Sequence, residues 1–180
     1  GAADPAAPGW AREPLADVAK ADVRDRMARA LEAVARQLGR TYPLQIGAAA
    51  VETGRWATSG NPARTDEAVG QVAQAGVAEV RRAVEAARAS LPAWAVLPVE
   101  ERVAVLRRAA DLMRRLRWEL AAWEVLEVGK SWREADVDVV EAIEYLEYYS
   151  AGMVELSRGK PLLQVPGERN RYLYMPRGVA

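Results

Sequence analysis

The sequence predicts a mostly α-helical chain with a small β-hairpin and short edge strands. From residue 77 onward, long stretches carry apolar residues at every third or fourth position, which is typical of amphipathic helices. Between residues 41 and 76 the apolar runs are short and are interrupted by Gly, Asn and Pro, which is typical of strands and turns. The chain has 180 residues, of which 51% are hydrophobic and 28% charged, so a globular chain with a core is expected.

The composition narrows the possible functions. Basic and acidic residues number 25 each, and this balance disfavours a nucleic-acid partner. No apolar run approaches the ~18 residues of a membrane span and no signal segment opens the chain, so a cytoplasmic location is expected. The sequence contains no Cys, His or Phe. A disulfide, a thiol nucleophile and an imidazole base are therefore excluded within this chain, and chemistry would depend on carboxylates, Lys, Arg, Tyr or hydroxyls.

The sequence at both ends of the chain indicates that it is a piece of a longer protein. The chain begins with Gly1 and the small, Pro-containing run GAADPAAPG, so residues 1–14 are expected to form a mobile N-terminal arm. Its last ten residues, RYLYMPRGVA, alternate like a strand and then run into proline and glycine. Residues 15–180 are interpreted as the N-terminal part of a larger domain.

The first half of the chain predicts a helix followed by strands. Residues 15–38 have helical periodicity and are followed by a glycine stop, with an apolar face of Val23, Met27, Leu31 and Val34. Residues 41–63 predict a hairpin that turns at Thr53–Gly54. Asn61–Pro62 marks a further turn, and residues 68–76 predict a strand.

The second half predicts helices over 77–90 and 99–114, with a fourth helix opened by a capping box of Ser131 and Glu134 and closed near Gly159. The core stripe of the helix at 99 continues toward Gly129, through Val103, Leu106, Ala110, Met113, Leu116, Leu120 and Trp123. Residues 160–175 are expected to be extended.

The acidic helix around residues 134–150 has two distinct faces at 100° per residue. Its apolar stripe consists of Ala135, Val139, Ala142, Ile143, Leu146 and Ser150, and the opposite face of Glu134, Asp138, Glu141, Tyr145 and Tyr148. Glu141 lies at the centre of the second face, beside two tyrosines. Because tyrosine buries a ring and keeps a polar tip, this face is interpreted either as the wall of a cleft or as a solvated surface favoured by the helix dipole.

Three other features have both a functional and a structural interpretation. The basic run RRLR at 114–117 indicates a phosphate contact, or a solvated flank or interface. Lys130 offers a catalytic amine or a structural anchor at a loop–helix junction. Glu134, Asp138 and Glu141 share a face and could bind a hard cation, although a helix alone cannot surround an ion with oxygens.

Five segments carry a resemblance to a known family. In chain order they are YPLQIG (42–47), NPA (61–63), AVEAARASLPAW (83–94), EVGKSWREADVDVVEAIEYLEYYS (127–150) and MPRGV (175–179). Together they resemble the aldehyde dehydrogenase superfamily, and within it the Δ1-pyrroline-5-carboxylate dehydrogenase branch, also called L-glutamate γ-semialdehyde dehydrogenase. The resemblance extends over nearly the whole chain from Trp10 onward.

The resemblance implies an α/β parent protein with a Rossmann-type NAD domain. It implies NAD-dependent oxidation of L-glutamate γ-semialdehyde to glutamate in proline catabolism, with the catalytic Cys, the water-activating Glu and the NAD-binding residues beyond Ala180. It also implies that Glu141, in DVVEAIEY, contacts the small-molecule aldehyde substrate. The parent is expected to be a homo-oligomer without a membrane span, standing alone or fused to a proline dehydrogenase domain. The alternative is a non-enzymatic helical interaction or assembly module derived from such an enzyme.

Overall fold

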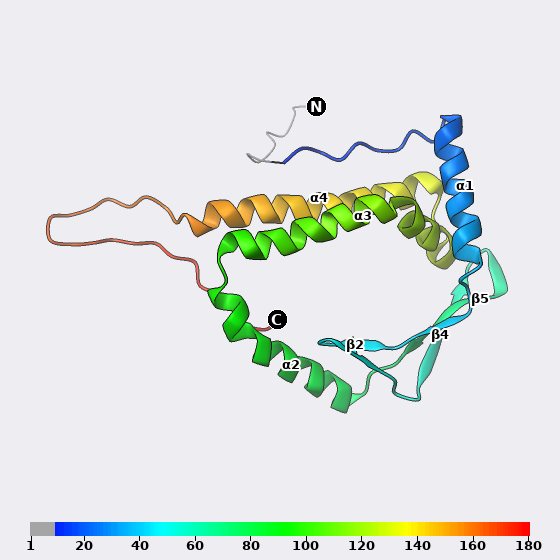
Figure 1. Ribbon diagram of the computed structural model, residues 1–180, viewed down its shortest axis with the longest axis horizontal. Coiled ribbons are helices and arrows are strands. Elements are labelled where there is room, and N and C mark those ends of the chain that lie inside the picture. The colour runs from blue at the N-terminus through cyan, green and yellow to red at the C-terminus, as the bar shows by residue number, and fades with distance from the viewer. Residues whose placement is uncertain (1–9) are drawn as a thin grey trace.

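Two long helices lying side by side form the body of the molecule (Figure 1). The computed structural model describes residues 10–180. Within that range the helices are α1 (Ala21–Ala35), α2 (Val77–Val96), α3 (Val99–Val128) and α4 (Trp132–Ser157), and the strands are β1 (Arg40–Tyr42), β2 (Leu44–Ile46), β3 (Ala49–Val51), β4 (Trp56–Asn61) and β5 (Arg64–Ala73). None of the helices in this part of the chain combines the length and the apolarity that crossing a bilayer requires.

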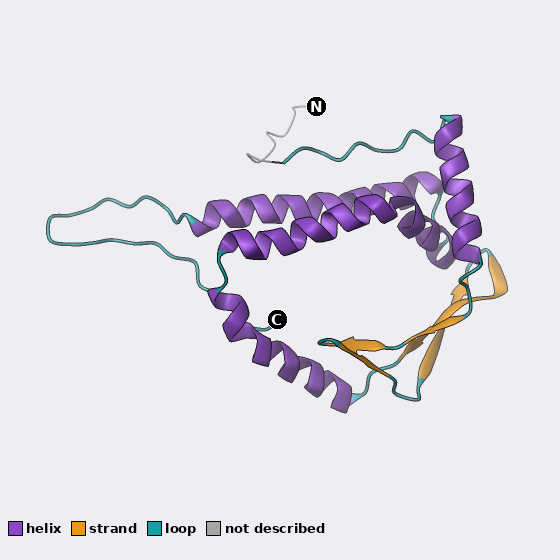
Figure 2. Ribbon diagram, in the orientation of Figure 1, coloured by secondary structure: helices purple, strands orange, loops and turns teal. Residues whose placement is uncertain are grey.

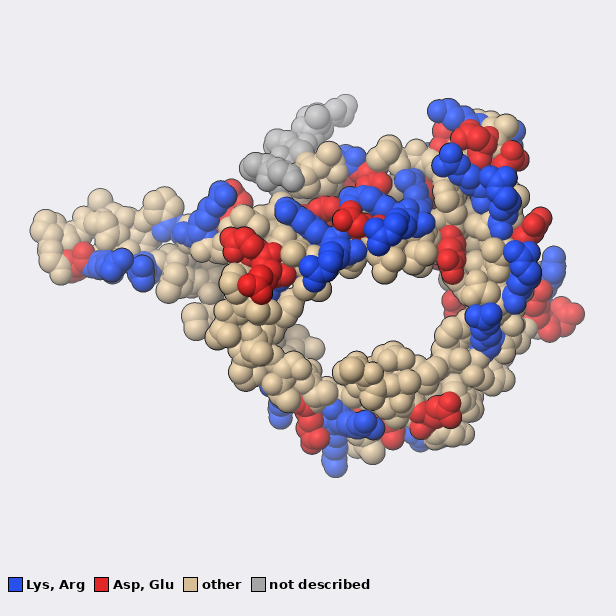
Figure 3. All heavy atoms as spheres, in the orientation of Figure 1, with Lys and Arg blue, Asp and Glu red and all other residues tan. Residues whose placement is uncertain are grey.

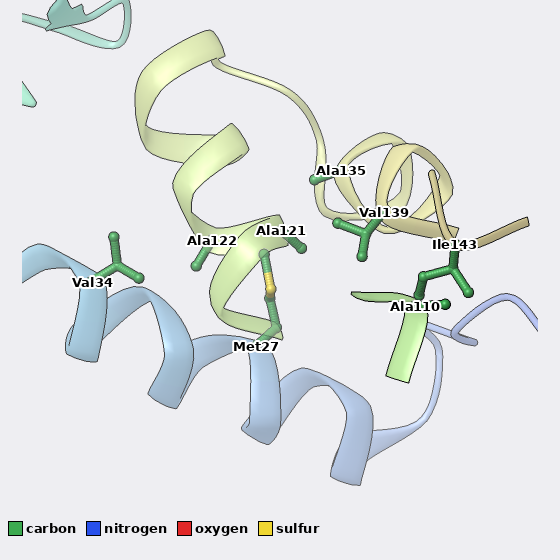
Figure 4. Close-up of a cluster of buried hydrophobic side chains, with 8 residues drawn as sticks. All are labelled: Met27, Val34, Ala110, Ala121, Ala122, Ala135, Val139 and Ile143. Carbon is green, nitrogen blue, oxygen red and sulfur yellow. The ribbon is translucent and has the colours of Figure 1, made fainter. Parts of the chain in front are cut away.

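Small side chains let α3 and α4 approach closely. The buried core cluster takes Met27 and Val34 from α1, Ala110, Ala121 and Ala122 from α3, and Ala135, Val139 and Ile143 from α4 (Figure 4). Alanine at the contact points shortens the distance between helix axes, while Met27 and Ile143 fill the remaining volume. Burial of a side chain such as Ile143 contributes about 1.5–3 kcal/mol to stability. The stripe predicted for the acidic helix therefore faces the core, and so does that of the helix at 99, except at Leu116, which is exposed.

The strands gather at one end of the molecule in two small sheets (Figure 2). β5 is central in a three-stranded sheet, paired in parallel with β1 and antiparallel with β4, and β2 and β3 form a separate antiparallel pair. The expected edge strands are thus present. The strand predicted over 68–76 starts earlier and ends at Ala73.

The predicted hairpin turn at Thr53–Gly54 is wrong. The chain reverses between β2 and β3 at Gly47, with φ of 60°, and between β4 and β5 at the Asn61–Pro62 turn. Thr53 instead makes a local turn between two strands that do not pair, since its hydroxyl donates to the Arg55 carbonyl (3.0 Å) and accepts from the Arg55 N–H (3.3 Å).

Helix bounds differ from the prediction at both ends of α1, which stops at Ala35 rather than at 38, and at the end of α2. α1 begins at Ala21 rather than 15, because the backbone before it is held by α4: the Ala16 N–H donates to Asp136 at 2.8 Å. α2 continues to Val96 through Pro92. The exposed Pro92 has no N–H to donate to the carbonyl of Arg88, so α2 continues through it with one backbone hydrogen bond fewer. By contrast, α3 is one continuous helix that ends at Gly129, in the left-handed conformation with φ of 76°.

The molecule is open in its middle. The space-filling view has an opening between the α3–α4 pair and the layer formed by α2 and the strands (Figure 3). α2 has no buried residue, and Val77, Val80 and Val96 are more than half exposed. After α4 the chain is extended, as predicted for 160–175, with one isolated antiparallel bridge between Lys160 and Tyr172. A helix that exposes these apolar side chains and buries none of its residues within 10–180 indicates a surface built to be covered.

Candidate functional site

The first acidic residues of α4 stabilise the start of the helix. Ser131 and Glu134 form the predicted capping box: the Ser131 hydroxyl accepts the Glu134 N–H (3.3 Å), and the Glu134 carboxylate accepts the Ser131 N–H (3.1 Å). The hydrogen bond from the Ser131 hydroxyl holds the pKa of Glu134 below its ordinary value. The capping box therefore fixes where α4 begins, and the packing of Ala135, Val139 and Ile143 in the core sets the direction in which its later side chains point.

Lys130 lies at the α3–α4 junction and forms ion pairs with both helices. Its ammonium is 3.0 Å from the Glu124 carboxylate and also pairs with Asp138. This geometry supports the structural interpretation of Lys130 as an anchor. Glu134 and Asp138 are thus both engaged, so the acidic face does not present three free ligands. Within residues 10–180 no group of three or more acidic side chains is placed to hold a metal ion.

Glu141 lies on the exposed face of α4, as the helical wheel predicts. Two adjoining cavities, of about 500 and 380 Å³, share three lining residues, Arg12, Glu141 and Glu144. The larger is completed by Glu13, Leu15, Val137 and Val140, and the smaller by Trp10, Tyr145 and Tyr148. Among residues 10–180 the Glu141 carboxylate has no ion-pair partner. Its negative charge is therefore not compensated by an ion pair within the described residues.

Aromatic rings form one side of the smaller cavity. Tyr145 and Tyr149 stack with centroids 5.9 Å apart, and Tyr148 meets Trp10 edge to face at 6.0 Å. A hydrogen bond to the Glu141 carboxylate, reinforced by its charge, raises the pKa of the Tyr145 hydroxyl. Tyr145 and Glu141 thus lie next to each other at the wall of the smaller cavity.

An ion-pair network beneath this face was missed by the sequence reasoning. The Arg117 guanidinium donates two hydrogen bonds to the buried Asp136 carboxylate, at 2.6 and 2.9 Å. Arg114 donates to Glu13 at 2.9 Å and to Glu147 at 3.0 Å. The RRLR run is therefore largely an interface between α3, α4 and the N-terminal segment. The sequence offered one signal for this pair: Asp136 lies next to the apolar stripe of α4, where a carboxylate needs a partner.

The expected mobile arm, 1–14, falls partly outside the described residues. Residues 10–14 lie extended beside α4 (Figure 1), where the Glu13 N–H donates to the Glu144 carboxylate at 3.1 Å. Arg117 donates to the Pro14 carbonyl at 2.9 Å. These contacts make residues 10–14 part of the Glu141 site.

The N-terminus of α2, which follows β5, does not offer its amide groups to a phosphate. The helix N-terminus that follows β5 is closed by its own side chain, since the Gly76 N–H donates to Glu79 at 2.6 Å. This hydrogen bond lowers the pKa of Glu79, and Arg55 lies 3.5 Å from the same carboxylate. A phosphate cannot use these amide groups while Glu79 occupies them.

Residues 49–180 match the sequence model of the aldehyde dehydrogenase family. The chain belongs to the aldehyde dehydrogenase family. It is 44% identical over 170 residues to the 1-pyrroline-5-carboxylate dehydrogenase of Bacillus pumilus, an alignment that covers 94% of this chain and 33% of that protein. The chain thus spans about a third of the length of the curated relatives it matches.

Solved structures of the aldehyde dehydrogenase family agree with this assignment. A mutant of the 1-pyrroline-5-carboxylate dehydrogenase of Thermus thermophilus superposes with a TM-score of 0.89 at 40% identity, over 93% of this chain and 33% of that one. Proline utilization A (PutA) from Bdellovibrio bacteriovorus gives 0.87 at 33% identity, over 98% of this chain and 18% of that one. A Thermus 1-pyrroline-5-carboxylate dehydrogenase with a TM-score of 0.89 and 40% identity, matched over 93% of this chain and 33% of its own, has been solved with bound NAD.

Proposed function

We propose that this chain is the N-terminal third of an NAD-dependent 1-pyrroline-5-carboxylate dehydrogenase, which oxidises L-glutamate γ-semialdehyde to glutamate. The observation that carries the proposal is the match over 94% of the chain, at 44% identity, to a relative bearing that name. The NAD-bound Thermus structure supports NAD as the cofactor. By itself, this chain has no cysteine to attack an aldehyde, so the chemistry belongs to the longer parent protein.

The open shape of the molecule supports a larger parent. The opening beside α3 and α4 and the exposed face of α2 match a segment that packs around further polypeptide (Figure 3). An independent assembly module, the alternative function, would also present exposed apolar surface. The proposal therefore depends on the family relationship rather than on the surface.

Within the parent, we assign Glu141 to the aldehyde substrate. Glu141 lines both cavities beside α4, lacks an ion pair within residues 10–180, and is positioned by a helix held by its core stripe and by the Lys130 anchor. A carboxylate in that place shapes the substrate entrance and interacts with the ammonium group of an amino-acid aldehyde. Proton transfer is left to groups outside this segment.

Partners of the parent follow from the same relatives. The PutA neighbour supports a fusion of the parent to a proline dehydrogenase domain. A homo-oligomer without nucleic-acid partners remains our expectation, as does the cytoplasmic location.

The assignment of Glu141 is tested by steady-state kinetics of the full-length protein. Replacing Glu141→Gln keeps the size of the side chain and removes its charge. We expect the KM for the semialdehyde to rise by about fivefold, while the KM for NAD is unchanged. Glu155→Gln, on the exposed last turn of the same helix and outside both cavities beside Glu141, is the matched control. An unchanged aldehyde KM in Glu141→Gln would remove Glu141 from the substrate site.

A further inference from the structure

The segment from Trp10 to Ala16, here called the N-terminal strap, crosses the face of α4 that carries Glu141. It supplies Trp10, Arg12, Glu13 and Leu15 to the walls of the two cavities, and α4 supplies the other lining residues. Without the strap, Glu141 would lie on an open helix surface. The pocket therefore exists only while the strap is in place.

Two arginines of α3 fix the strap at points on both sides of Glu141. On one side, Arg117 holds the Pro14 carbonyl at 2.9 Å and also Asp136, which accepts the Ala16 N–H at 2.8 Å. Charge-assisted hydrogen bonds of this kind are stronger than neutral ones and fix direction as well as distance.

On the other side, the strap is held through Glu13. Its carboxylate accepts from Arg114 at 2.9 Å, and its own N–H donates to Glu144 at 3.1 Å. Glu144 lies one turn beyond Glu141 and lines both cavities. Beyond it, Trp10 packs edge to face on Tyr148. The strap is thus attached before and after the position of Glu141 along α4.

We infer that the N-terminal strap is a positioning element that completes the substrate pocket around Glu141, with Glu13 as its main side-chain latch. The inference rests on the proposed function of the parent protein. Among residues 10–180, Arg12 from the strap is the one cation that lines the two cavities, beside the carboxylates of Glu141 and Glu144. A ligand carrying both an ammonium and a carboxylate, such as an amino-acid aldehyde, is complementary to this arrangement.

The test compares two variants that each remove one carboxylate from Arg114 in the full-length enzyme. Glu13→Ala releases the strap, whereas Asp111→Ala removes an exposed partner at 2.9 Å and leaves the strap attached. For Glu13→Ala we expect faster hydrogen exchange in residues 10–16 and an aldehyde KM raised by about threefold or more, with kcat and the KM for NAD within about twofold of wild type. Asp111→Ala should change none of these quantities.

A second variant covers the case in which Glu13→Ala leaves the strap attached. Deletion of residues 1–12 removes Trp10 and Arg12 from the cavities while keeping Glu13 and the core. It is expected to raise the aldehyde KM at least as much as Glu13→Ala does. Unchanged aldehyde KM values in the deletion variant, or in a Glu13→Ala protein with demonstrably faster strap exchange, would overturn the inference.

The Glu141→Gln variant distinguishes a failure of the proposed substrate site from a failure of the inference about the strap. If Glu141→Gln raises the aldehyde KM and the strap variants do not, the substrate site stands and the strap is only structural. If Glu141→Gln leaves the KM unchanged, both the site and the strap inference fall.

Discussion

Breaking the buried Arg117–Asp136 ion pair should destabilise the protein far more than breaking an exposed ion pair. The side chain of Asp136 is 3% exposed and that of Arg117 is 13% exposed, and two hydrogen bonds of 2.6 and 2.9 Å join them. Asp136→Ala would leave the guanidinium of Arg117 without its main partner and the Ala16 N–H without an acceptor. Removing one partner of a buried pair costs about 3–5 kcal/mol. Because Arg117 retains some access to water, we expect a loss near the lower limit, about 3 kcal/mol.

A double mutant tests the origin of that loss. Replacing both partners, as Asp136→Leu with Arg117→Met, removes the stranded charge and fills the space with apolar atoms. The double variant should lose only about 1–2 kcal/mol, much of it from the unpaired Ala16 N–H, and so less than the sum of the two single variants.

The assay is equilibrium unfolding in urea, followed by tryptophan fluorescence at low protein concentration. Asp111→Ala is the control, because it removes a carboxylate that is 60% exposed and should cost about 0.5 kcal/mol. The reasoning would be refuted if Asp136→Ala cost no more than this control, or if the two single losses were additive in the double variant.

Four further predictions concern the cap of α4, the pH dependence of that cap, the glycines and the exposed surface. Ser131→Ala should lower the free energy of unfolding by about 1 kcal/mol in urea titrations, through loss of the α4 cap. The pKa of Glu134 in the folded state lies below its ordinary 4.5. The extra stability of wild type over Glu134→Gln should therefore be complete above pH 4.5 and disappear as the pH falls through the folded-state pKa. Thermal melts at a series of pH values measure this difference. Gly129→Ala should lower the free energy of unfolding by about 2 kcal/mol, because Gly129 has φ of 76° and a Cβ there would lie 2.9 Å from Pro62. Gly152→Ala should raise it by about 0.5–1 kcal/mol, because Gly152 lies in a helix with open space around it. Equal effects of the two substitutions in calorimetry would contradict this. The isolated chain should self-associate through its exposed apolar faces, and a sharply melting monomer of 19.7 kDa in light scattering and calorimetry would contradict that expectation.

Sequence reasoning located the helices because their signals are local. The faces of α3 and α4 are set by residues three and four apart, so the stripe through Ala135, Val139 and Ile143 was readable, and so was the opposite face with Glu141. The Ser131 cap was readable for the same reason. Strand pairing was not, since β1 pairs in parallel with residues some 30 positions away, as Arg40 does with Gly70.

The rest of the candidate site depends on contacts between distant segments. The Ala16 N–H meets Asp136 across 120 positions, and Arg114 meets Glu13 across 101. No local pattern marks such a pair, and an arginine-rich run reads equally well as a solvated flank. The late start of α1 has the same cause, because a long-range hydrogen bond holds the backbone before it extended. Periodicity therefore revealed the face of Glu141 but not the strap that covers it.

The most direct test of the central claim is NADH formation by the full-length polypeptide that carries this segment, supplied with 1-pyrroline-5-carboxylate and NAD. A pyrroline-5-carboxylate dehydrogenase should form one NADH per glutamate produced, at a rate that saturates with the semialdehyde. No NADH above a substrate-free control, from protein that is folded and binds NAD, would contradict the proposed activity. The segment would then be better explained as an assembly module that retains the fold of the family.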